Sequence, residues 1–234
     1  MGGADRRKSF HYRLRGPAGF AHELKVVIDG ATLECIEPAP AARPWTELGC
    51  HQCPNCPLDR SVEPLCPFAA RIEPVVVPLG ALLSHDRVEI EADCGDRRVV
   101  GATSAQAAAS SLIGLIGATS GCPRTAFLKP MAWFHLPLAT EEETVFRAAA
   151  SYLLGQYFAF EQGRQPDWEL AGLKHQYEEL HTVNIAMAAR LRQAVEKDAS
   201  VNAIVCLDLF AKAVPWSIED FFDSLRWLFA GNRD

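Results

Sequence analysis

The chain of 234 residues has a net charge of −6, with 49% apolar and 22% charged residues. These values are typical of a soluble globular protein that is long enough to bury one sizeable core. The acidic balance argues against a general nucleic-acid binder, whose binding face would be basic, and we interpret the only basic cluster, Arg6-Arg7-Lys8, as a solvated arm.

No stretch of the sequence has the apolar length of a membrane span or of a signal-peptide core. The longest apolar segment, 201–215, is interrupted by Asn202, Asp208 and Lys212, and residues 1–15 alternate charged and aromatic side chains. We therefore expect a cytosolic protein with no membrane partner. In that reducing compartment, clustered cysteines bind metals more often than they form disulfides.

Residues 1–102 have the pattern of antiparallel β structure. Alternating or β-rich segments predict five strands, at 10–15, 21–28, 32–37, 87–91 and 98–102. The dipeptide Asp29-Gly30 is a strong hairpin signal between two of them. A proline-rich cysteine loop occupies 49–67. Residues 69–84 are ambiguous, because Pro74 and Pro78 are expected to break any helix there.

Residues 103–234 are expected to be helical. Apolar spacing and capping signals predict helices over about 104–119, 141–160, 168–194, 201–214 and from 217 onward. Thr140 and Glu143 have the spacing of a capping box, and Asp167 is placed to cap the third helix. The apolar stripe of that helix also contains Asn184, where a polar residue can fix register.

Together these elements predict an α+β fold. A small antiparallel sheet with an inserted Cys-Pro loop would pack on a C-terminal helical lobe. The β region, 1–102, and the helical region, 103–234, would form one compact unit.

Four of the eight cysteines are followed directly by proline, whereas chance predicts about half of one such pair. They are Cys53, Cys56, Cys66 and Cys122. Proline fixes its own φ and pushes the preceding residue toward extended geometry, so that each sulfur is directed away from its chain. Four thiolates close a tetrahedral zinc site or hold a [4Fe–4S] cluster. The pattern therefore predicts a metal centre.

The spacing of these cysteines bears on which metal they bind. Cys53 and Cys56 form one C-x-x-C pair, whereas Cys66 and Cys122 are separate. Zinc ribbons usually draw on two close pairs, and dispersed ligands suit the four corners of a cubane. We favour [4Fe–4S] over Zn²⁺; the remaining alternatives are no metal, or a thiol redox pair at Cys53 and Cys56. Cys50 or His51 could substitute as a ligand.

Residues around Cys122 are candidates for tuning the centre. The hydroxyls of Thr119 and Ser120 could donate to sulfur, and Arg124 could offset the charge of four thiolates. The site would join the two halves of the chain, so the metal has either a structural role or a redox or sensing role. Cys35, Cys94 and Cys206 are interpreted as structural.

Other groups of residues in the sequence give weaker evidence for a functional site. Glu178-x-x-His181, with His175, has the spacing of di-iron carboxylate bundles, but the sequence has no second such motif and a solvated face explains it better. Gly114 and Gly117 lack nucleotide-binding spacing and indicate close helix packing. No acid, base and nucleophile can be assembled, which argues against an enzyme.

Three segments of the chain are distinctive: His51-Gln52-Cys53-Pro54-Asn55-Cys56-Pro57-Leu58, Ala118-Thr119-Ser120-Gly121-Cys122-Pro123 and, after them, Phe134-His135-Leu136-Pro137. They resemble segments of an uncharacterised family of bacterial conserved hypothetical proteins. That resemblance implies a bacterial origin and no particular activity. The Cys53-x-x-Cys56-x-Leu58 run is also similar to the first ligand pair of some iron–sulfur uracil-DNA glycosylases, whose α/β pattern and acidic and histidine motifs this chain lacks.

Three functional hypotheses follow. The first is a cytosolic iron–sulfur protein in electron transfer or redox sensing, with a redox or regulatory protein partner. The second is a structural-zinc adaptor whose helical lobe binds a protein partner. The third is a helix-bundle di-metal enzyme that uses Glu178 and His181.

Overall fold

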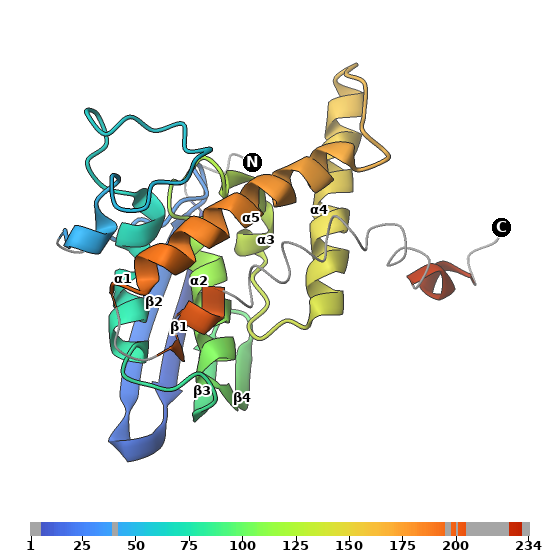
Figure 1. The fold of residues 1–234 in the computed structure, drawn as a ribbon. Helices are drawn as coiled ribbons and strands as arrows, with labels where there is room; N and C mark the ends of the chain where they lie inside the picture. Colours follow the sequence, from blue (N-terminus) through green and yellow to red (C-terminus); the bar gives the residue numbers. More distant parts are fainter. Residues whose placement is uncertain (1–5, 39–41, 195–197, 200, 205–224, 231–234) are drawn as a thin grey trace.

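The structure, a computed structural model, describes residues 6–38, 42–194, 198–199, 201–204 and 225–230. It has the expected α+β class: a four-stranded antiparallel sheet covered on one face by helices (Figure 1). The strands, in sheet order β2-β1-β3-β4, are β2 Ala21–Asp29, β1 Arg7–Arg15, β3 Arg87–Asp93 and β4 Arg98–Ser104. The α-helices of the described residues are α1 Pro67–Leu79, α2 Ala105–Ala118, α3 Lys129–Trp133, α4 Glu141–Glu161 and α5 Ala171–Leu191.

The two faces of the sheet differ because side chains alternate along a strand. In β1, Phe10, Tyr12 and Leu14 are fully buried against the helices. On the other face, the Arg13 guanidinium pairs with Glu91 of β3 and lies 3.7 Å from Glu23 of β2. One face is therefore core and the other a network of surface ion pairs.

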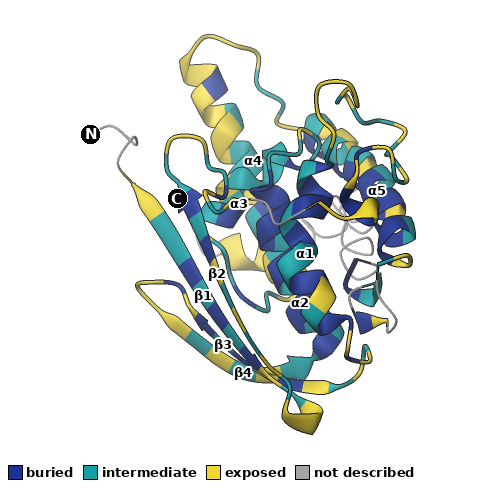
Figure 2. Ribbon diagram, turned by 90° about the vertical axis from the view of Figure 1, so that its left-hand side faces the viewer, coloured by how far each residue is buried: buried dark blue, intermediate teal, exposed yellow. Residues whose placement is uncertain are grey.

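The structure is built in layers. Helices α1 and α2 cover the sheet, and α5 lies on their far side (Figure 2). One continuous hydrophobic core runs from Phe10 of β1 to Leu191 of α5. Within the described residues, no helix is long and apolar enough to cross a membrane.

The prediction of a fifth strand at 32–37 is wrong. The segment forms only an isolated bridge between Ile28 and Cys35. Leu33 has a left-handed backbone with φ 56°, and the Cys35 N–H donates to the Thr119 carbonyl at the end of α2, 2.9 Å away. Because that donor is directed at a helix, a regular ladder cannot continue through the segment.

The prediction that Pro74 and Pro78 prevent a helix is also wrong. Helix α1 runs through both prolines and buries Ile72, Val75, Val76 and Leu79 completely. An interior proline costs about 3 kcal/mol or more. Each large apolar side chain taken from water contributes about 1.5–3 kcal/mol. Tertiary burial therefore outweighs the local penalty.

The capping signals are confirmed with small shifts. Ser104 caps α2 by accepting from the Ala107 N–H, and Thr140 with Glu143 forms the capping box of α4. The Asp167 carboxylate accepts from the first N–H groups of α5, so it caps the helix from four residues before its start. Most of the predicted helix at 201–214, and the start of the one from 217, lie outside the described residues.

Candidate metal centre

The four Cys-Pro cysteines line one small cavity of about 10 Å³. Cys53 and Cys56 come from the loop before α1, Cys66 is the residue that precedes α1, and Cys122 follows α2. Helix α5 closes the cavity with Val183, Met187 and Arg190. Three segments that are distant in sequence are thus brought together at the end of the α1–α2 layer.

Local backbone geometry directs each sulfur toward this point. The Cys56 N–H donates to the Cys53 carbonyl at 3.0 Å, which closes the C-x-x-C turn. Cys66 has the extended geometry that a following proline favours, with φ −72° and ψ 114°. Before Cys122, Gly121 has a φ of 87°, a conformation that glycine adopts without the strain that a Cβ would add. The backbone conformations that proline and glycine favour therefore position the cysteines around the cavity.

The electrostatics show that the four thiols are close neighbours. Burial, together with the charges that Cys66, Cys122 and Cys56 would carry, raises the pKa of the Cys53 thiol to about 12. Burial also raises the pKa of Cys66 and of Cys122. A bound cation reverses this tendency, because a thiol that coordinates a metal is deprotonated outright.

Two features of the site favour thiolates despite this burial. The N–H groups of Ala69 and Phe68, in the first turn of α1, lower the pKa of the Cys66 thiol. The backbone N–H groups of Arg124 and Thr125 act in the same direction on Cys122. Such donors at a helix start are the groups that stabilise anionic sulfur.

Arg190 is a member of the site that the sequence interpretation missed. Its side chain is 1% exposed and its Nη1 donates to the carbonyls of Trp45 and Glu47, at 2.8 and 2.5 Å. Its buried Nε has no hydrogen-bond partner among the described residues. The Arg190 charge lowers the pKa of the Cys53 and Cys66 thiols. One signal existed: Arg190 follows Met187 by three positions, on the buried stripe of α5.

Arg124, the cation proposed from the sequence, also lines the cavity, but acidic and carbonyl groups share its charge. Its Nε donates to the Asn55 carbonyl at 2.7 Å, and its Nη1 lies 2.9 Å from the Glu179 carboxylate. The Asn55 amide in turn donates to Glu179 at 3.0 Å. These contacts dock the Cys53–Cys56 turn on α5.

Thr119 and Ser120 have a different role from the expected one. The Thr119 hydroxyl donates to the Leu115 and Ile116 carbonyls, and the Ser120 hydroxyl donates to Gly117 at 2.8 Å. The Ser120 oxygen also accepts from the Cys122 N–H at 3.2 Å. Both residues therefore terminate α2 and hold the Cys122 backbone, while their protons go to carbonyls.

The substitute ligands lie outside the cavity. The Cys50 thiol donates to the Gln193 amide oxygen at 3.5 Å, and the His51 ring contacts the Gln193 amide nitrogen at 2.8 Å. Cys35 and Cys94 are buried in the core, while Cys206 lies outside the described residues. His175 and Glu178 are exposed on α5, with 71% and 65% of their side chains accessible.

The four thiols share a cavity rather than a preformed ligand set for one ion. In the part of the chain that the structure describes, no three His, Cys, Asp or Glu side chains converge closely enough to hold one metal ion. The four thiols nevertheless face the same cavity and influence one another's pKa. Four thiols from three segments of the chain therefore share one cavity.

Comparison with known proteins gives one match. No curated protein and no solved structure is similar to the chain. The model of a family described as a domain of unknown function, DUF6901, matches residues 10–230. This match includes both halves of the fold and all four cysteines of the cavity, and the chain therefore belongs to the DUF6901 family.

Proposed function

We propose that the protein binds a [4Fe–4S] cluster through Cys53, Cys56, Cys66 and Cys122, and that it acts in cytosolic electron transfer or redox sensing. The observation that carries the proposal is the convergence of four thiols, from three separate segments, on one cavity. Structural thiols have no need to gather in this way, because each of them could pack separately among apolar side chains, as Cys35 and Cys94 do.

The spacing of the four cysteines along the sequence supports a cluster. A zinc ion holds each of its sulfurs at about 2.3 Å from one point. A cubane binds its four thiolates at four separate corners, and its ligands therefore lie farther apart. Cys53 and Cys56 form one close pair while Cys66 and Cys122 are separate, and such a dispersed set suits four corners better than it suits a zinc ribbon.

The surroundings suit a redox centre. When bound, a [4Fe–4S] cluster supplies one-electron chemistry, taking an electron from a donor protein and passing it to an acceptor. Arg190 contributes a buried positive charge beside the thiols, and the first turn of α1 directs N–H groups toward Cys66. Charge and hydrogen bonds at the sulfurs are the features that set a cluster's reduction potential.

A structural-zinc adaptor is the second candidate, and a specific observation favours it. The free space among the thiols, about 10 Å³, is roughly that of one water-sized sphere. A single ion is closer to this size than a cubane, which would have to displace the surrounding side chains. In this alternative the metal fixes the fold, and the helical surface binds a protein partner.

Anaerobic purification followed by an optical spectrum and metal analysis decides between the two. If the cluster is bound, we expect brown protein that absorbs at about 400 nm and contains iron and sulfide in equal amounts. Cys53→Ser and Cys122→Ser should each remove most of this absorbance. Cys50→Ser is the matched control, because Cys50 lies in the same loop with its thiol directed at Gln193.

Colourless anaerobic protein with one zinc per chain would contradict the cluster and support the adaptor. Protein without any metal, from cells supplied with both iron and zinc, would contradict both candidates. Full metal content in Cys122→Ser would show that the centre does not use the helical half of the chain.

A further inference from the structure

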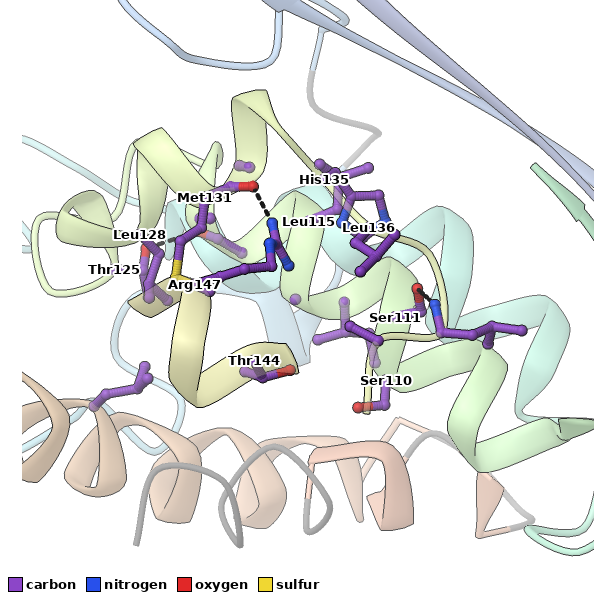
Figure 3. Close-up of a pocket in the computed structure, with 18 of the residues that line it drawn as sticks. Ser110, Ser111, Leu115, Thr125, Leu128, Met131, His135, Leu136, Thr144 and Arg147 are labelled. Carbon is purple, nitrogen blue, oxygen red and sulfur yellow. Dashed lines mark hydrogen bonds between the residues drawn. The ribbon is translucent and has the colours of Figure 1, made fainter. Parts of the chain in front are cut away.

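A second, larger cavity lies between α2, the segment that follows it, α4 and α5 (Figure 3). Its volume is about 320 Å³, at the lower end of the range of about 300–1,000 Å³ for small-molecule sites. The walls are mainly apolar, with Leu115 from α2 and Leu128, Met131 and Leu136 from the connecting segment. None of the four Cys-Pro cysteines lines it.

Asn184 supplies an unsatisfied donor to this cavity. The residue lies on the buried stripe of α5, is 2% exposed and lines the cavity. Its amide nitrogen has no hydrogen-bond partner among the described residues. A buried donor without a partner costs about 1–3 kcal/mol. An acceptor atom entering the cavity would remove that cost.

Arg147 supplies a positive charge. It reaches into the cavity from α4, and its Nη2 donates to the carbonyls of Met131 and Phe134, at 2.7 and 2.8 Å (Figure 3). Burial lowers the pKa of the guanidinium, because the charge is partly removed from water. In the described part of the chain, no carboxylate lies within ion-pair distance of it. The guanidinium therefore has carbonyl dipoles beside it, and Glu143, one turn earlier on α4, attracts it from beyond ion-pair distance.

His135, the other basic side chain of the cavity, does not add to this charge. Burial, followed by the Arg147 charge, lowers its pKa to about 3, so the ring is neutral at pH 7. The ring nitrogen Nε2 is already hydrogen-bonded to the Tyr12 hydroxyl. The cavity therefore combines an apolar wall, one cation without a direct ion pair among the described residues, and one amide donor without a partner there.

We propose that this cavity binds a small organic acid with an apolar body. Its carboxylate forms the direct ion pair that Arg147 lacks among the described residues, and its oxygen atoms provide the acceptor that the Asn184 amide lacks there. Its hydrocarbon part lies against Leu115, Leu128 and Met131. This binding site is separate from the thiol cavity and does not depend on which metal, if any, occupies that cavity.

Isothermal titration calorimetry with decanoate, below its micelle concentration, tests the proposal on the full-length protein. Decanoate should bind with one site per chain, and decanol, which lacks the charge, should bind about tenfold or more weakly. Asn184→Leu and Arg147→Gln should each weaken decanoate binding by about tenfold. Asn184→Leu also removes an unsatisfied amide, and we expect this variant to fold at least as well as the wild type.

Gln176→Leu is the matched control. Gln176 is on the same helix, and its side-chain oxygen is also buried without a partner, but the residue does not line this cavity. This variant should bind decanoate as the wild type does. Absence of saturable binding to the wild type, equal binding of decanol and decanoate, or undiminished binding to Asn184→Leu would each overturn the proposal.

Discussion

Arg190 is the residue on which the environment of the thiol cavity depends most. A buried guanidinium needs hydrogen-bond partners, and here the carbonyls of Trp45 and Glu47 provide them. The same side chain positions the loop that leads to Cys53 and brings a positive charge to the thiols. One residue of α5 thus links the stability of the loop to the electrostatics of the centre.

We expect Arg190→Met to have two measurable effects. The free energy of unfolding should fall by about 2–4 kcal/mol, because two buried carbonyls lose their donor. The reduction potential of a bound cluster should become more negative, because the lost positive charge no longer favours the added electron. Denaturant unfolding and a redox titration measure the two effects.

Arg192→Met is the control, because this arginine is exposed at the end of the same helix. An unchanged potential in Arg190→Met, with normal cluster content, would show that the charge is too distant or too well screened to act on the centre.

For single residues, the sequence predicted which cysteines line the cavity but not which other side chains surround them. The Cys-Pro steps fix local backbone geometry, and local geometry can be inferred from adjacent residues. The choice between Arg124 and Arg190 depends on which helix closes the cavity, and no local pattern contains that information. Thr119 and Ser120 were assigned to sulfur because the nearby carbonyls of α2, which accept their protons, could not be placed from sequence.

At the scale of the elements, the contact between α1 and α2 depends on a glycine. A Cβ built on Gly117 would lie 2.7 Å from the ring of Phe68, closer than real side chains approach. The small residues of α2 therefore allow the two helices to approach, as their sequence predicts. Phe68 in turn follows Pro67 and lines the thiol cavity, so this packing positions the start of α1.

Gly117→Ala should lower the free energy of unfolding by about 1–3 kcal/mol, because overpacking is costly in a well-packed core. Alanine is the better helix former by only about 1 kcal/mol, which reduces the net loss without reversing it. Gly155→Ala is the matched control on α4, where a Cβ would meet no described atom within 4 Å. That change should stabilise the protein by about 0.5–1 kcal/mol, and equal effects in both variants would contradict the packing argument.

The helices that begin with strong capping signals were predictable, because capping is decided within one turn. Helix α1 was not, because its stability comes from Ile72, Val75 and Val76 in the shared core rather than from its own propensity. The segment at 32–37 was wrongly predicted as a strand because its local composition favours a strand while its tertiary contacts do not. The Cys35 N–H, which a ladder would need, donates instead to the Thr119 carbonyl at the end of α2.

For the whole molecule, the candidate metal centre joins the loop of the β region to the end of α2. Metal binding that requires this arrangement contributes its free energy to folding. Removal of the metal should therefore lower the temperature of unfolding of the whole chain rather than loosen one loop.

The Cys122→Ser variant, compared with and without metal, shows how much of the contribution of Cys122 to stability depends on the metal. In metal-loaded protein the change should lower the melting temperature toward that of the chelated wild type. In chelated protein the same change should cost less than about 1 kcal/mol, because it replaces one small side chain by another. Calorimetry of both proteins, loaded and chelated, measures this, with Cys50→Ser as control. Identical melting of loaded and chelated wild type would show that the centre contributes nothing to the fold.

Helix α5 lies over both cavities: it presents Asn184 to one, and Val183, Met187 and Arg190 to the other. We therefore expect a local opening of α5, of the kind that hydrogen exchange detects, to expose both cavities together. The rate at which a chelator extracts the metal would then equal the opening rate of α5 and stay constant as the chelator concentration rises. The same opening would expose the cavity that Asn184 lines, so metal loss and release of an organic acid should respond together to changes in α5.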